Sequence, residues 1–190
     1  MSIRKIRWLA SDKTWRRLEE QNNHLSVYMY RDFMNVYRVI YKAGVQRWNK
    51  RIVLYEFISK SGIKALIPLL EDKNNIYICG DLCATGSLDF IYPDTIQEND
   101  FSELFIDLRR IAGGRVINLN KIHQNSLMYA YLQNHYECKD ELVCVNIPIP
   151  DSTEKYYNSL SKSTRQNYRT AKNRLIKEEK QYHLDFYLNR

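Results

Sequence analysis

Hydrophobic residues recur along the chain at two spacings, one helical and one extended. A period of three to four residues runs through residues 30–41, 101–111 and 126–135, which predicts an amphipathic helix in each segment. Gly113 and Gly114 follow the second segment, and glycine is the preferred residue just beyond a helix C-terminus. The side chains that these patterns and one strand pattern place in the core are Phe33, Tyr37, Ile40, Leu104, Phe105, Leu108, Tyr131 and Leu142.

Runs rich in β-branched and aromatic residues predict strands over residues 51–58, 63–70 and 76–79. Turn residues separate these runs, so the three strands are expected to form an antiparallel meander. Pro68 lies inside the second run and has no backbone N–H, which predicts an edge position or a bulge. Three further helices are predicted: one over residues 14–22, a short one that begins at Ser152 or Thr153, and a long one over residues 162–179. Three further strands are predicted over residues 116–119, 142–147 and 182–188.

This order of elements favours a mixed α/β fold. Strands come early and then alternate with helices, a pattern typical of a sheet with helices on both faces. The sheet should be largely antiparallel, because the meander supplies three consecutive strands. No obvious domain boundary interrupts the chain, so a single domain is expected over residues 1–190.

The net charge of +7 is distributed unevenly. Residues 1–51 carry 12 Lys/Arg against 4 Asp/Glu, residues 52–150 carry 8 against 13, and residues 151–190 carry 9 against 5. Basic ends of this kind attract phosphate groups of nucleic acid, lipid headgroups or CoA, although a solvated surface gives the same pattern. Aromatic residues are not interleaved with the basic positions as in single-strand readers, which disfavours a nucleic-acid partner.

The four cysteines suggest a reducing compartment. Cys79 and Cys83 lie four residues apart without a second pair at zinc-site spacing, and nothing indicates a disulfide framework. We therefore expect a cytoplasmic protein without a metal. The first eight residues carry charges without a following apolar region, so we expect that they are not a signal peptide. No run of about 18 apolar residues occurs in the sequence, so no transmembrane segment is expected.

Residues 156–175 carry the most specific pattern in the chain. The positions concerned are Leu160, Lys162, Arg165, Arg169, Arg174 and Leu175. This segment resembles the arginine-rich helix found midway through CelD-type acetyltransferases. The earlier features that are similar to that family are Trp15 in a first helix, the pair Pro68 and Leu69, the pair Asp89 and Phe90, and the pair Asn118 and Leu119.

The resemblance implies a GNAT-like fold and an acyltransferase related to the Fem-type aminoacyltransferases. Such an enzyme transfers an acyl group from acetyl-CoA or another acyl-CoA to an amine or hydroxyl of a glycan or cell-envelope precursor. In the family the helix is followed by roughly 150 further residues, about one domain, that hold the CoA-like site. Since this sequence ends at Arg190, the chain is expected to be the first half of a tandem enzyme that needs a second GNAT-like half or a partner chain. The alternative is a non-catalytic GNAT-like module that binds a partner protein or a phosphorylated glycan.

Two groups of residues are candidates for the site. Asp89 lies in the long loop over residues 80–96 and could act as a general base or substrate anchor, or simply form a turn. Arg165, Arg169 and Lys172 share one edge of the basic helix, where guanidinium groups could bind phosphate oxygens bidentately. The alternative is an amphipathic surface helix with its basic side chains in solvent.

Two other patterns are interpreted as structural. Residues 110–115 superficially resemble a GNAT pyrophosphate loop, but that loop must lie between a strand and a helix N-terminus. Here the segment lies between a helix and a strand, which predicts a helix C-cap instead. The four histidines are dispersed along the chain and form no recognisable cluster, so each is interpreted as a surface or packing residue.

Overall fold

The computed structural model describes residues 2–47, 49–81, 86–137 and 150–178. The chain divides into two compact units, Met1–Leu142 and Val143–Arg190, and each is described by itself. The expectation of a single domain over residues 1–190 therefore stays a prediction. The predicted strands over residues 142–147 and 182–188, and the core position of Leu142, lie outside the described residues.

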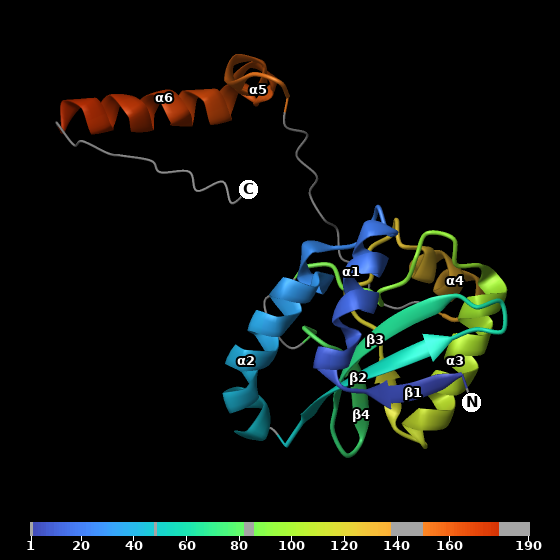
Figure 1. The fold of residues 1–190 in the computed structure, drawn as a ribbon. Coiled ribbons are helices and arrows are strands. Elements are labelled where there is room, and N and C mark those ends of the chain that lie inside the picture. The colour runs from blue at the N-terminus through green and yellow to red at the C-terminus, as the bar shows by residue number, and fades with distance from the viewer. Residues whose placement is uncertain (1, 48, 82–85, 138–149, 179–190) are drawn as a thin grey trace. The chain divides into compact units, whose positions relative to one another are not determined.

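A five-stranded mixed sheet forms the centre of the first unit, in the order β1-β2-β3-β4-β5 (Figure 1). Its strands are β1 (Ile3–Ile6), β2 (Arg51–Ile58), β3 (Lys64–Glu71), β4 (Asn75–Ile78) and β5 (Val116–Asn118). The pairs β1–β2, β2–β3 and β3–β4 are antiparallel, and β5 pairs with β4 in parallel. The predicted meander and the largely antiparallel α/β sheet are thus confirmed.

Helices cover both faces of this sheet. The helices are α1 (Asp12–Glu20), α2 (Arg31–Arg47), α3 (Glu98–Ala112) and α4 (Leu127–His135). Figure 1 shows α1 on the near side of the sheet and α3 on the far side. Every residue of β3 from Ala65 to Glu71 is buried, so this central strand is covered on both faces.

Two features of the sheet differ from the sequence expectations. β1 was not expected, because it has only four residues and its apolar Ile3 and Ile6 do not alternate. Pro68 is neither at an edge nor at a bulge, since it pairs with Leu54 inside the regular ladder between β2 and β3. Its carbonyl accepts a 2.9 Å hydrogen bond from the Cys79 N–H, so its backbone faces β4, where the ladder is already ending. The residue opposite is Cys79, which lies just beyond the end of β4, so the missing N–H removes no hydrogen bond from the β3–β4 ladder itself.

The core confirms most of the periodicity predictions. Leu104, Phe105, Leu108 and Tyr131 are buried in one cluster, Tyr37 lies in the same cluster, and Phe33 packs against it. Ile40 was predicted wrongly, because 71% of its surface is exposed. Tyr41 packs against the cluster instead and stacks on Tyr37 with ring centroids 4.7 Å apart. At 100° per residue, Ile40 falls beyond the buried arc of α2.

The end of α3 confirms that residues 110–115 form a helix C-cap. Gly113 adopts a left-handed conformation with φ of 58°, and its N–H bonds back to the Arg109 carbonyl. The Arg115 guanidinium then donates to the carbonyls of Ala112 and Ile111 at 2.9 and 2.8 Å, which satisfies the last acceptors of the helix.

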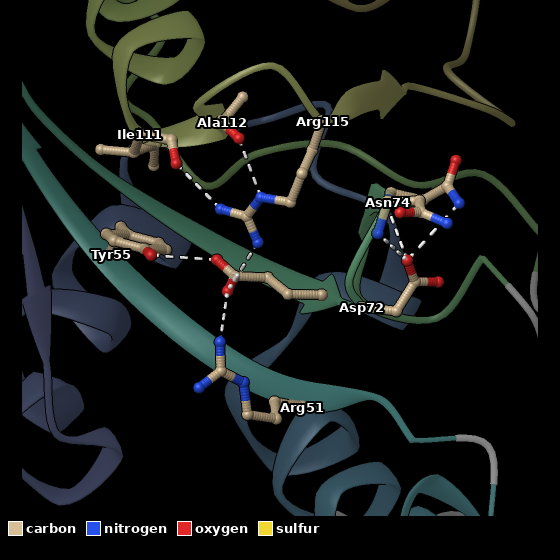
Figure 2. A network of polar contacts seen from close by, with 9 residues as sticks. Arg51, Tyr55, Asp72, Asn74, Ile111, Ala112 and Arg115 are labelled. Atoms are coloured by element: carbon tan, nitrogen blue, oxygen red, sulfur yellow. Dashed lines mark hydrogen bonds and ion pairs between the residues drawn. The ribbon is translucent and has the colours of Figure 1, made fainter.

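Arg115 also attaches this cap to the sheet through the buried carboxylate of Glu71 (Figure 2). Its Nη1 lies 3.2 Å from Glu71 Oε2, and the Tyr55 hydroxyl donates to Oε1 at 2.9 Å. Burial, followed by this hydrogen bond to Glu71, raises the pKa of Tyr55 to about 12. The network fixes the start of β5, which follows Arg115 directly.

The second unit contains two described helices, α5 (Thr153–Ser159) and α6 (Lys162–Lys177). Ser152 caps α5 by accepting the Lys155 N–H, and Ser161 caps α6 by accepting the Thr164 N–H. Both helices were predicted, and the long basic helix ends within two residues of the expected position.

Candidate functional site

The loop that carries Asp89 is held on both sides by short pieces of extended structure. Leu88 forms a parallel bridge with Ile122 and donates its N–H to the Lys121 carbonyl at 2.9 Å. Ile91 forms an antiparallel bridge with Leu66 of β3, with both hydrogen bonds between 2.7 and 2.9 Å. Asp89 lies between these two bridges, so its backbone is held on one side by β3 and on the other by the segment that follows β5.

The carboxyl group of Asp89 is buried and receives hydrogen bonds from several donors. Its Oδ1 accepts the Phe90 N–H at 2.7 Å, and its Oδ2 accepts the Tyr92 hydroxyl at 2.8 Å. Burial raises the pKa of Asp89 to about 7, although hydrogen bonds from Ser126, Tyr92 and the Phe90 N–H oppose that rise. Desolvation therefore outweighs these donors, and the group exchanges its proton near neutral pH.

Tyr92 and Ser126 connect this carboxyl to the first turn of α4. The Tyr92 hydroxyl lies 3.1 Å from Ser126 Oγ and accepts the Met128 N–H at 3.2 Å. Ser126 is the N-cap of α4 and accepts the Tyr129 N–H. Burial also raises the pKa of Tyr92, so the phenol stays protonated as a donor to Asp89.

A cavity of about 210 Å³ opens beside this group. Its lining residues come from three separate segments and are His24, Ser26, Ser87, Leu88, Asp89, His123, Asn125 and Ser126. The segments at residues 87–89 and 123–126 follow the parallel strands β4 and β5 in the chain. Ligands of α/β proteins commonly bind outside the carboxyl ends of parallel strands, which makes this cavity the leading candidate for a site.

Two histidines in the cavity wall were not identified from the sequence. His24 is exposed and His123 is half-buried, and both line the cavity that contains Asp89. His123 Nδ1 accepts the Asn125 N–H at 3.1 Å, so in the neutral ring the proton lies on Nε2 and that nitrogen is a donor. They stand 99 positions apart in the chain, so no spacing rule could have paired them.

In α3, the helix that follows β4, the first turn is already occupied by carboxylates of the helix itself. Asp100 accepts the Gln97 N–H at 2.9 Å in a capping box, and Glu98 adds a second negative charge to the same turn. A bound phosphate would have to displace or approach these carboxylates. The N-terminus of α3 is therefore unsuited to a pyrophosphate.

The basic positions predicted from the sequence lie together on α6. Arg165 donates from Nη1 to the carbonyls of Asn158 and Leu160 at 2.8 and 2.9 Å. Arg169 donates from Nε to the Tyr157 hydroxyl at 2.9 Å, and Lys172 is exposed one turn further along. Asp89 belongs to the first unit and these residues to the second.

Comparison with protein-family models, with curated proteins and with solved structures finds no match to this chain. None of the helices in the described ranges combines the length and the apolar character needed to cross a bilayer. Within those same ranges, no three side chains of His, Cys, Asp or Glu gather in a way that could hold a metal ion.

Proposed function

We propose that this chain is part of a cytoplasmic GNAT-type acyltransferase, and that the cavity beside Asp89 receives the acceptor. The reaction would move an acetyl or other acyl group from acyl-CoA to an amine or hydroxyl of a glycan or cell-envelope precursor. One observation carries the proposal: the loop carboxylate selected from the sequence lies in a cavity wall, buried, with its pKa raised to about 7.

That pKa suits the proton transfer that acyl transfer requires. When an amine or hydroxyl attacks the thioester carbonyl, the new bond to carbon forms while the attacking atom loses a proton to the base. The C–S bond then breaks, and CoA leaves as a thiolate that takes up a proton to become the free thiol. A general base is most effective when its pKa is near the working pH, as that of Asp89 is. Tyr92 and Ser126 hold the carboxyl in place, and the donor Nε2 of His123 would orient an acceptor oxygen.

The polar character of the cavity fits a glycan acceptor. Six of the residues that line it carry a hydroxyl, an imidazole or an amide, which are the groups that bind sugar hydroxyls. The order of elements on which the resemblance to CelD-type acetyltransferases partly rests is also present in the first unit. Both points support an acceptor site without identifying the sugar.

Acyl-CoA would be held mainly by a second GNAT-like half or a partner chain. The support is the capping box at α3, which fills the strand-to-helix junction where amides could otherwise bind a pyrophosphate. Residues 1–190 alone are accordingly expected to bind acyl-CoA weakly or not at all.

A non-catalytic binding module is the second candidate. One observation favours it: both oxygens of Asp89 already accept hydrogen bonds within the protein. In that case the carboxyl shapes the cavity and takes no proton from a ligand.

Calorimetry of residues 1–190 with acetyl-CoA tests whether this chain alone binds acyl-CoA or whether a second half is needed. Micromolar binding would contradict the half-enzyme idea and favour a complete acyltransferase. Titration with amino sugars, followed by thermal shift, then tests the acceptor cavity.

Thiol release at millimolar acetyl-CoA separates the two candidates. If Asp89 is the base, Asp89→Asn lowers transfer to a bound amino sugar by roughly 10²- to 10⁴-fold while sugar binding persists. Sugar binding without any transfer, in the wild-type chain mixed with its second half, would support the binding module. Asp94→Asn is the matched control, because this half-buried carboxylate of the same loop bonds to Asn23 and does not line the cavity, so both readouts should stay unchanged.

A further inference from the structure

The α5–α6 hairpin holds two guanidinium groups in fixed positions. Arg165 reaches across to the carbonyls of Asn158 and Leu160, which are acceptors at the end of α5. Arg169, one turn later, is bound to the Tyr157 hydroxyl, and its guanidinium carbon lies 6.0 Å from the centroid of the same ring. Both side chains have therefore lost rotamer freedom before any ligand arrives.

These guanidinium groups are oriented but not neutralised. Their partners are two backbone carbonyls and a phenol, none of which carries negative charge. In the described part of the second unit, the ion pairs involve other residues: Lys155 with Asp151, and Arg174 with Glu178. Residues 151–178 carry 7 Lys/Arg against 3 Asp/Glu, so the positive charge of the hairpin is in excess. Oriented, uncompensated guanidinium groups are the usual means of binding phosphate oxygens.

The spacing fits two phosphates better than one. Residues four apart on a helix lie roughly 6 Å from each other, so Arg165 and Arg169 can each meet one half of a diphosphate. Lys172 continues the same edge of α6 and adds a point charge about 10 Å along the axis from Arg165. Each guanidinium has five N–H donors, and the bonds within the hairpin use only one nitrogen of each.

We propose that the α5–α6 hairpin binds the diphosphate group of a small ester, with Arg165 and Arg169 as the paired donors and Lys172 as an added charge. This inference is independent of the acceptor cavity in the first unit. A nucleoside diphosphate and a lipid-linked diphosphate share the chemistry, so the experiment must distinguish them.

A single-stranded nucleic acid fits the hairpin less well. Such ligands stack their bases on open aromatic faces. Here the Tyr157 ring is approached by the Arg169 guanidinium and, edge-on, by Tyr168 at 5.5 Å between centroids. The Tyr157 ring is thus engaged within the hairpin.

The test is a calorimetric titration of the full chain at low ionic strength. Inorganic pyrophosphate is the first probe, and binding roughly tenfold tighter than that of inorganic phosphate is expected. UDP is then titrated as a nucleoside diphosphate, and farnesyl diphosphate as a lipid-linked diphosphate. Tighter binding of either than of pyrophosphate supports the proposal and identifies the source.

Two variants distinguish an oriented site from diffuse attraction. Arg169→Gln should weaken pyrophosphate binding about tenfold, whereas Arg174→Gln removes the same charge from the ion pair with Glu178 and should weaken it less than threefold. Tyr157→Phe keeps every charge and removes only the hydroxyl that orients Arg169, so weaker binding by this variant supports a preoriented site. Circular dichroism checks that α6 persists in each variant; Arg165 is not substituted, because it also caps α5.

Three results would overturn the proposal. One is the absence of pyrophosphate binding up to about 10 mM, which is weaker than any specific site. Another is an equal loss of binding in Arg169→Gln and Arg174→Gln. The third is binding of an oligothymidylate that weakens steeply with salt and that pyrophosphate does not displace, which would indicate a nucleic-acid surface. Failure of acyl transfer would leave this inference standing, since the two experiments have separate readouts.

Discussion

The Tyr92 hydroxyl donates a 2.8 Å hydrogen bond to the carboxyl of Asp89 and at the same time accepts the Met128 N–H at 3.2 Å. One phenol thus connects the loop after β4 to the first turn of α4. Because the cavity wall contains residues from both segments, its shape depends on this connection.

Replacing Asp89 by Asn should flatten the dependence of stability on pH. In the unfolded chain the carboxyl ionises above about pH 4, whereas in the folded chain burial keeps it protonated up to about pH 7. The folded state therefore binds the additional proton in this window, and wild-type stability falls as pH rises from about 4 to about 7, by up to a few kcal/mol. Urea unfolding of both proteins at pH 5, 6, 7 and 8 measures the difference.

The Asn side chain can keep the bond from the Phe90 N–H and cannot ionise. The stability of the variant relative to the wild type should thus increase steadily from pH 5 to about pH 7 and stay higher at pH 8. His24 and His123 line the same cavity in both proteins, so only the difference between the two curves reports on Asp89. Parallel curves would show that the carboxyl is ionised in the folded state throughout.

Tyr92→Phe should lower the free energy of unfolding by about 1–3 kcal/mol, since it leaves the buried Met128 N–H without its acceptor and removes one of the donors to Asp89. Tyr131→Phe is the matched control, because that hydroxyl makes a longer, part-buried 3.3 Å contact with Ser102. Equal losses in chemical denaturation of the two variants would argue against the connecting role of Tyr92.

Leu108→Ala should cost about 2–5 kcal/mol, because the side chain is fully buried and its removal leaves a cavity. Ile106, two residues earlier on the same helix, is 56% exposed, and its replacement by Ala should cost less than about 1 kcal/mol. An unchanged urea midpoint for Leu108→Ala would mean that this face of α3 is not packed.

Arg115→Ala should be far more destabilising than Arg51→Ala, although both arginines approach the same carboxylate of Glu71. The Arg115 side chain is largely buried and also caps α3, so its loss leaves a buried charge poorly compensated, at a cost of about 3–5 kcal/mol. The Arg51 side chain is exposed and lies 3.6 Å away, so its loss should cost less than about 1 kcal/mol. Thermal unfolding of both variants measures the ranking, and a reversed order would contradict it.

Local sequence patterns correctly predicted the features that depend on residues close together in the chain. The two glycines after α3 predicted its end, because Gly113 adopts a left-handed conformation there. Leu108 was predicted to be buried because its helix has a single apolar stripe. Ile40 was predicted wrongly because α2 carries apolar residues nearly all round, and periodicity alone could not select the side that packs.

Contacts between residues far apart in the chain could not be predicted from the sequence. Asp89 could be selected for its place in a long loop, but its burial depends on Tyr92 and on Ser126, which is 37 residues away. His123 became a candidate only when the fold brought it to the cavity. Likewise, the partners that orient Arg165 and Arg169 depend on the turn between α5 and α6, which no helical pattern encodes.

The parallel pairing of β5 with β4 has a consequence for the order of folding. The antiparallel strands β2, β3 and β4 are joined by short turns, whereas β5 reaches β4 only after the chain has passed through α3. Closing that longer connection is entropically slower, so β5 and α4 should dock after the meander has formed. The cavity, which needs residues on both sides of this crossover, would then be completed last. Amide hydrogen exchange in β5 and α4 should accordingly be faster than in β3, and each such opening would dismantle the cavity while leaving the meander intact.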